Sequence, residues 1–219
     1  MNRGVSRAVV FDLDGTLIDS APDIHAAANR LMERHGFAPF TPAETRGFIG
    51  SGVPHFIACC LEARGRGDDT ALHARMIAEF IESYETAVDL TALYPGVVTA
   101  LEALGRDGLS FGLCTNKPVV PARAVLAHLG LSAHFPVVIG GDSLTARKPD
   151  PAPLCAAFEG LGVPGGLFVG DSEIDAETAA RAEVPFILYT EGYRKVPVDD
   201  IPHARRFADF ADLPGIVAE

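Results

Sequence analysis

The chain has 219 residues, of which 48% are hydrophobic and 21% charged, as in an ordinary soluble globular protein of one large or two smaller domains. Its formal net charge of −11 argues against nucleic acid or an anionic membrane as a partner, since both bind a basic face. The four cysteines lack metal-type spacing, and the first apolar run is broken by Asp12, too early for a signal peptide or a membrane span. We therefore expect a cytoplasmic protein with core thiols.

The first predicted element is a strand over residues 8–11, a continuous apolar run that ends at Asp12. The stretch from there to the next strand is too long for a simple crossover. It carries helix-period patterns at three places, residues 24–32, 53–61 and 72–88. We expect residues 19–90 to form a helical cap domain inserted into a catalytic core made of residues 1–18 and 91–219.

The second half of the chain alternates short apolar runs with helical patterns. Four further strands are predicted, at residues 111–114, 137–139, 167–169 and 186–189. Helices are predicted to begin near Pro95, Pro118 and Pro151, because proline is favoured in the first turn of a helix. Continuous apolar runs suit strands buried on both faces, so the alternation predicts an α/β fold with a doubly wound parallel sheet.

Polar residues follow three of these strands where each strand ends. They are Asp12 and Asp14 after the first, Thr115, Asn116 and Lys117 after the second, and Asp171 and Asp175 after the fourth. In the common strand order 3-2-1-4-5 the first strand lies between the second and the fourth, so the three groups meet at the carboxyl edge of the sheet. Lys148, in the loop after the third strand, is expected to reach the same edge.

Four carboxylates in one cleft repel one another unless a cation lies among them. Oxygen ligands without a His or Cys cluster favour Mg²⁺, and a metal, a hydroxyl and a lysine are what a transferring phosphoryl group requires. Asp12, close to the rigid strand, suits a nucleophile that forms an aspartyl-phosphate. Asp14 suits the acid that protonates the leaving alkoxide and then activates water, and Thr16 is expected to hold the Asp14 side chain by a hydrogen bond.

The segments FDLDGTLIDS, TNK, KPDP and GDSEID resemble, in order and spacing, the four motifs of haloacid-dehalogenase-like hydrolases. The resemblance covers nearly the whole chain. It implies that Asp12 is the nucleophile and Asp14 the general acid–base. It further implies a phosphoryl site, for which the candidates are Thr115, Asn116 and Lys148. The implied Mg²⁺ site consists of the Asp12 carboxylate, the Asp14 main-chain carbonyl and Asp171, with Asp175 supporting the site through water or through contact with another ligand.

The run from LYPGV to GDSEIDAETAARA resembles the phosphoglycolate phosphatases within that family, which implies hydrolysis of the small phosphomonoester 2-phosphoglycolate to glycolate and phosphate. Arg46 is the candidate for the substrate carboxylate, because a cation must be specifically placed in a cap segment that is itself acidic. The alternative is an exposed helix arginine. Glu183 stands where the family usually has glycine after the last motif, which should alter a helix cap and leave the chemistry intact.

Several alternatives stay open at this point. Another small sugar phosphate as substrate, or a phosphomutase activity, would use the same core. A haloacid dehalogenase normally lacks the second aspartate, and a phosphonate hydrolase needs a cap lysine, whereas no lysine precedes Lys117. The non-enzyme alternative is a signalling receiver, but its phosphorylated aspartate follows the third strand, where Gly140 stands here. Lys117 is an alternative to Lys148 as the lysine that binds the phosphoryl group, or it is a solvated residue beside a helix start. The sequence does not indicate the oligomeric state.

Overall fold

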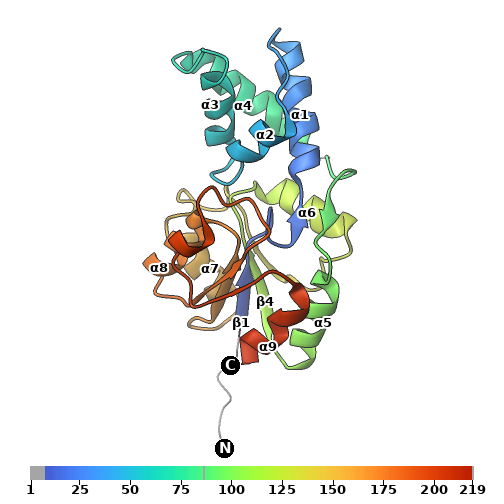
Figure 1. Ribbon diagram of the computed structural model, residues 1–219, viewed down its shortest axis with the longest axis vertical. Helices are drawn as coiled ribbons and strands as arrows, with labels where there is room; N and C mark the ends of the chain where they lie inside the picture. Colours follow the sequence, from blue (N-terminus) through green and yellow to red (C-terminus); the bar gives the residue numbers. More distant parts are fainter. Residues whose placement is uncertain (1–7, 86, 219) are drawn as a thin grey trace, which may run out of the picture.

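The structure is a computed structural model that describes residues 8–85 and 87–218. Its larger part is a six-stranded parallel sheet in the order β5-β4-β1-β6-β7-β8 (Figure 1). The strands are β1 (Ala8–Phe11), β4 (Ser110–Cys114), β5 (Val137–Ile139), β6 (Leu167–Gly170), β7 (Phe186–Tyr189) and β8 (Arg205–Phe207). The predicted order of the first five strands is confirmed, and β8 is an additional edge strand that the sequence did not predict.

Helices cover both faces of the sheet, so the doubly wound prediction is confirmed. Val9 and Phe11 of β1 pack in one core with α5 (Val97–Arg106), α6 (Val119–His128) and α9 (Leu213–Ala218). Ala8 and Val10 face the other core, which contains α7 (Ala152–Gly160) and α8 (Glu173–Arg181). Successive residues of a strand point to opposite faces, so the continuous apolar run of β1 follows from its place at the centre of the sheet.

The inserted segment forms a separate helical layer at the carboxyl end of the sheet (Figure 1). Its helices are α1 (Ala21–Arg34), α2 (Pro42–Phe48), α3 (Val53–Glu62) and α4 (Thr70–Tyr84), and they share their own apolar cluster. The predicted stripe of α4 is buried at Leu72, Met76, Phe80 and Tyr84, whereas Val88 lies beyond the helix and packs against the core of the sheet.

The chain crosses between the two layers at a pair of short antiparallel strands, β2 (Ile18–Asp19) and β3 (Ala92–Leu93). Asp23 of α1 ties the second crossing to the first, because its carboxylate accepts hydrogen bonds from Leu90 N–H (3.0 Å) and the Thr91 hydroxyl (2.6 Å). Both crossings lie beside residues 19 and 90, where the sequence predicts the limits of the cap. Two single-turn 3₁₀ helices, η1 (Val198–Asp200) and η2 (Phe210–Asp212), complete the described elements.

None of the helices in the described residues is long and apolar enough to cross a membrane. All four cysteines are free thiols. Cys60 and Cys114 are buried as expected of core thiols, but Cys155 is exposed on α7, so the prediction of core thiols is wrong for that residue.

The helix after the last motif ends on a left-handed residue that is not glycine. Glu183, two residues beyond the end of α8, has a φ of 55°. Its N–H donates to Ala180 O (3.2 Å) and the next N–H, of Val184, donates to Ala179 O (2.9 Å). These are the paired bonds of a Schellman motif, which favours glycine at this position. Glu183 therefore lies at the helix-cap position that the sequence predicts.

We expect Glu183→Gly to stabilise the folded protein by about 1 kcal/mol, since a side chain in the left-handed region costs roughly 1–2 kcal/mol and glycine does not bear this cost. The measurement is the free energy of unfolding from urea titration. Glu177→Gly, at an exposed position inside α8, is the matched control and should destabilise by about 1 kcal/mol. A loss of stability in Glu183→Gly would contradict the strain at this cap.

Candidate active site

The side chains that the sequence places at strand ends meet at the carboxyl edge of the sheet. Asp12 directly follows β1, and its N–H extends the ladder to Val169 O at 2.8 Å. Thr115 directly follows β4 and bonds in the same way to Ile139 O at 3.0 Å. Asp12, Thr115 and Lys148 are all buried, so backbone pairing fixes the two strand-end residues in a solvent-poor site.

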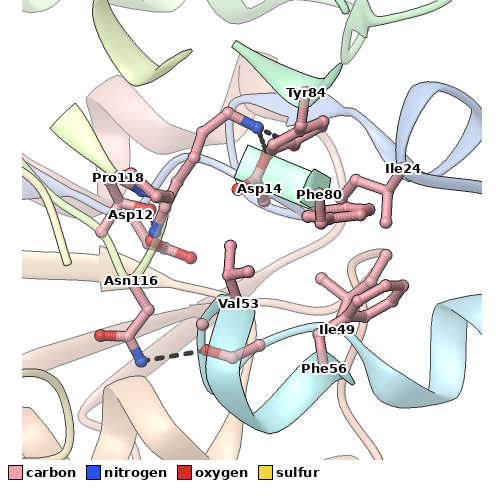
Figure 2. Close-up of a pocket in the computed structure, with 14 residues that line it drawn as sticks. Asp12, Asp14, Ile24, Ile49, Val53, Phe56, Phe80, Tyr84, Asn116 and Pro118 are labelled. Atoms are coloured by element: carbon pink, nitrogen blue, oxygen red, sulfur yellow. Dashed lines mark hydrogen bonds and ion pairs between the residues drawn. The ribbon is translucent and has the colours of Figure 1, made fainter. Parts of the chain in front are cut away.

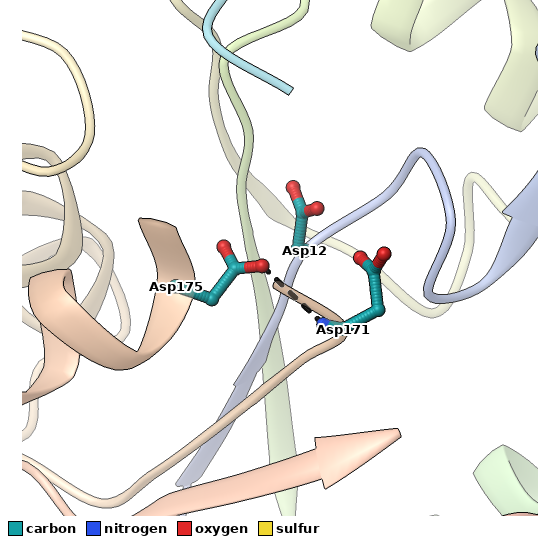
Figure 3. A group of neighbouring side chains, drawn as sticks. All are labelled: Asp12, Asp171 and Asp175. Atoms are coloured by element: carbon teal, nitrogen blue, oxygen red, sulfur yellow. Dashed lines mark hydrogen bonds between the residues drawn. The ribbon is translucent and has the colours of Figure 1, made fainter. Parts of the chain in front are cut away.

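Three buried carboxylates form the centre of the site. Asp12, Asp171 and Asp175 each offer an oxygen within 4.8 Å of the others (Figure 3). Burial raises the pKa of Asp12 to about 7, with Lys148 opposing the shift and Asp175 adding to it. Burial, with the negative charges of Asp175 and Asp12 adding to it, raises the pKa of Asp171 well above its ordinary value. An all-oxygen cluster with this much mutual repulsion fits a hard divalent cation.

Asp171 is held rigidly by its neighbours. Its carboxylate accepts hydrogen bonds from the Thr16 hydroxyl (2.8 Å) and from Tyr193 N–H (2.5 Å). A Cβ at Gly15 or at Gly192 would lie within 2.5 Å of an Asp171 oxygen, so both positions need glycine for close approach. The predicted hydrogen bond from Thr16 to Asp14 is therefore wrong, because the turn at Gly15 directs the Thr16 hydroxyl towards Asp171 at the end of β6.

Lys148 lies between two of the acids. Its ammonium donates to Asp12 (2.8 Å) and to Asp175 (2.6 Å). Burial acts to lower the pKa of Lys148, but Asp12 and Asp175 together raise it above its ordinary value, so the residue stays charged. Asp175 also accepts the Ser172 hydroxyl (2.6 Å) in the capping box of α8. One carboxylate thus starts the helix and fixes the lysine.

Lys117 pairs with Asp14 as Lys148 pairs with Asp12. It is 7% exposed, so the alternative of a solvated residue is wrong. Its ammonium donates to Asp14 (3.1 Å) and to the Tyr84 hydroxyl at the end of α4, and it lies 4.2 Å from the centre of the Tyr84 ring. Asp14 also accepts a short bond of 2.5 Å from the Ser20 hydroxyl. Sequence reasoning named Lys117 but missed this pairing, because Tyr84 comes from the distant cap.

A pocket lies between the sheet edge and the helical layer (Figure 2). The core lines it with Asp12, Asp14, Thr115, Asn116, Lys117 and Pro118, and the cap with Ile24, Ile49, Gly50, Gly52, Val53, Phe56, Phe80 and Tyr84. Asn116 joins the two sides, because its amide N–H groups donate to Gly50 O and to Lys148 O, both at 3.0 Å. The pocket therefore combines one polar wall with one mainly apolar wall.

Arg46 does not line this pocket. Its guanidinium pairs with Asp19 at 3.3 Å and lies 4.9 Å from the centre of the Tyr193 ring, with its side chain about half exposed. Arg46 belongs to the last turn of α2 and lines a different hollow, together with Asp19 and Leu90. The structure thus brings together every candidate site residue except Arg46.

Comparison with known proteins gives concordant results. Residues 6–183 match the family model of haloacid dehalogenase-like hydrolases. The chain is 49% identical over 210 residues to the phosphoglycolate phosphatase of Rhodobacter capsulatus, covering 96% of each, and 42% identical over 217 residues to that of Rhodospirillum rubrum, covering 94% and 89%. The crystal structure of a predicted phosphoglycolate phosphatase from Haemophilus somnus 129PT has a TM-score of 0.89 at 27% identity, covering 98% of this chain and 99% of that one.

The carboxylate cluster predicts that a divalent cation stabilises the protein more at pH 8 than at pH 5.5. Raised pKa values mean that the folded cation-free protein binds more protons than the unfolded chain between pH 4 and 7, so its stability falls as pH rises through this window. The cation replaces those protons and reverses the loss. The measurement is the difference in Tm between MgCl₂ and EDTA at each pH.

Asp171→Asn is the control for this experiment, since it removes one charged ligand and should reduce the cation-dependent rise in Tm at pH 8. A rise that is equal at both pH values, or larger at pH 5.5, would contradict cation binding by these carboxylates.

Proposed function

The chain belongs to the haloacid dehalogenase-like hydrolases, and from that premise we propose that it is a Mg²⁺-dependent phosphatase that hydrolyses 2-phosphoglycolate to glycolate and phosphate. The observation that carries the reaction type is the pairing of buried Asp12 with Lys148 inside a cluster of three carboxylates. The substrate is supported by the names of relatives at 49% and 42% identity.

Asp12 is proposed as the nucleophile. One carboxylate oxygen attacks phosphorus, the bond to the alkoxide breaks, and an aspartyl-phosphate forms. Lys148 neutralises the phosphoryl oxygens from its place beside Asp12. The Thr115 hydroxyl accepts a bond from Lys117 N–H (3.2 Å), so its own hydrogen can go to a phosphoryl oxygen. Mg²⁺ held by the Asp12, Asp171 and Asp175 carboxylates and the Asp14 main-chain carbonyl would screen the repulsion between nucleophile and phosphoryl group.

Asp14 is proposed as the general acid–base. In the first step its proton goes to the leaving glycolate alkoxide, and in the second its carboxylate takes a proton from the water that attacks the aspartyl-phosphate. Phosphate leaves, and Asp12 and protonated Asp14 are regenerated. Bonds from Ser20 and Lys117 hold the Asp14 carboxylate towards the pocket, on the side of the leaving group.

The cap, proposed as residues 19–90, limits the size of the leaving group. Its apolar side chains, among them Phe56 and Phe80, close the pocket opposite the acids. Such a wall excludes water and bulky alcohols, so small phosphomonoesters should react and nucleotides should not. We further propose a cytoplasmic location, which the four free thiols support.

The test of the function is a phosphate-release assay over 2-phosphoglycolate, ethyl phosphate, a hexose phosphate and a nucleotide, each with Mg²⁺ or EDTA. We expect 2-phosphoglycolate to give the highest kcat/KM, with activity lost in EDTA and restored by Mg²⁺. Full activity in EDTA would refute the metal site. Phosphoryl transfer to a second sugar phosphate in place of phosphate release would identify a phosphomutase.

Two variants distinguish the proposed roles of Asp12 and Asp14. With acetyl phosphate, a small substrate whose acetate leaving group needs no proton, Asp14→Asn should give a burst of acetate and then turn over about 10²- to 10⁴-fold more slowly than wild type. Asp12→Asn should give no burst, because no covalent intermediate can form. The measurement is rapid chemical quench with enzyme at high concentration, and the acetate released is compared with the amount of enzyme. Steady-state turnover of Asp14→Asn near the wild-type rate would contradict its assigned role.

A further inference from the structure

We infer that Lys117 is the specificity-determining residue that binds the carboxylate of the substrate. The inference rests on the proposed function, since it concerns which group recognises the glycolate part of 2-phosphoglycolate. Lys117 takes the place of Arg46 as the candidate for binding the carboxylate, since Arg46 pairs with Asp19 outside the pocket.

Lys117 is the cation on the polar wall of the pocket. Among the described residues that line this pocket, no other lysine or arginine occurs, and the wall opposite is formed by apolar side chains such as Ile24 and Phe80. The ammonium has three hydrogens, and the hydrogen bonds found within the described chain occupy two of them, on Asp14 and Tyr84. One donor is therefore left for an anion in a low-dielectric pocket, where a charge-assisted bond is strong.

The distance from Lys117 to Asp14 matches the structure of the substrate. If Asp14 protonates the ester oxygen from hydrogen-bond distance, the Lys117 ammonium, 3.1 Å from Asp14, lies within roughly 6 Å of that oxygen. A single methylene separates the ester oxygen from the carboxylate in 2-phosphoglycolate. A carboxylate at that spacing reaches Lys117 while the ester oxygen stays on Asp14.

Tyr84 supplies a second donor at the same place. Asp14 and Tyr84 lie side by side at the pocket (Figure 2). Burial raises the pKa of Tyr84 well above its ordinary value, so the hydroxyl keeps its hydrogen. Its oxygen accepts a bond from Lys117, and its hydrogen remains available to a carboxylate oxygen. The two lysines then divide the charges of the substrate, with Lys148 at the phosphoryl group and Lys117 at the carboxylate.

The experiment compares kcat/KM for 2-phosphoglycolate with kcat/KM for ethyl phosphate, which lacks the carboxylate. Lys117→Met should lower this ratio by about 10- to 100-fold, the value of one charge-assisted hydrogen bond. Lys117→Arg should restore much of the ratio, because it keeps the charge. Tyr84→Phe should lower it by a few fold, as expected for a neutral donor. Circular dichroism and Tm establish that each variant is folded, and Lys117→Gln is the substitute if the methionine variant unfolds.

Two further variants test the competing cations. Arg46→Met removes the alternative candidate on the cap, and Lys195→Met removes the exposed lysine after Tyr193. Both should leave the substrate ratio within about twofold of wild type, as is usual for surface substitutions. A collapse of the ratio in either variant would overturn the inference.

The outcomes separate the inference from the proposed function. If Lys117 only positions Asp14, Lys117→Met slows both substrates equally and leaves the ratio unchanged, which overturns the inference while wild type still prefers 2-phosphoglycolate. If wild type itself shows no preference for 2-phosphoglycolate over ethyl phosphate, the proposed function fails first and the carboxylate assignment fails with it.

Discussion

The burial of three carboxylates around one lysine is the constraint on which the site depends. Asp12 and Asp171 directly follow the neighbouring strands β1 and β6, and Asp175 lies in the first turn of α8, so the three carboxylates meet at one place. Burial is the main cause that raises the pKa values of Asp12 and Asp171, and the neighbouring carboxylates add to it, because the single ammonium of Lys148 cannot balance three negative charges. A site short of positive charge in this way attracts a cation, and the glycines around Asp171 keep its carboxylate close to the other two.

Charge pairing also links Asp12 and Asp14 to different lysines and to different layers of the protein. Asp12, directly after β1, pairs with Lys148, which lies in the loop between β5 and α7. Asp14 pairs with Lys117 and with Ser20, which begins the cap. The proposed general acid is thus bonded to the first residues of the helical layer, whereas the proposed nucleophile is bonded within the sheet-containing core.

Much of this arrangement follows from strand ends alone. Apolar runs and the turn after each run were enough to place Asp12, Thr115 and Asp171 at one edge, because parallel strands in a doubly wound sheet share that edge. The elements α2, β2, β3 and β8 were not predicted, because none of them carries a continuous apolar run of three or more residues or a clear helical period. Side-chain partners across long separations were missed for a different reason. The bond from Thr16 to Asp171 spans 155 residues and depends on a turn whose direction no local pattern encodes.

Tyr193 connects Asp171 to the start of the helical layer by hydrogen bonds. Its backbone N–H donates to Asp171, while its hydroxyl accepts the N–H groups of Ser20 (2.8 Å) and Ala21 (3.0 Å) and donates to Asp19 (2.6 Å). One residue therefore touches both the carboxylate cluster and the first crossing strand. Ser20 in turn holds Asp14, so displacement of the cap at this crossing disturbs the orientation of the acid and the support of Asp171 together. The same set of hydrogen bonds therefore connects the first crossing strand to Asp14 and to Asp171.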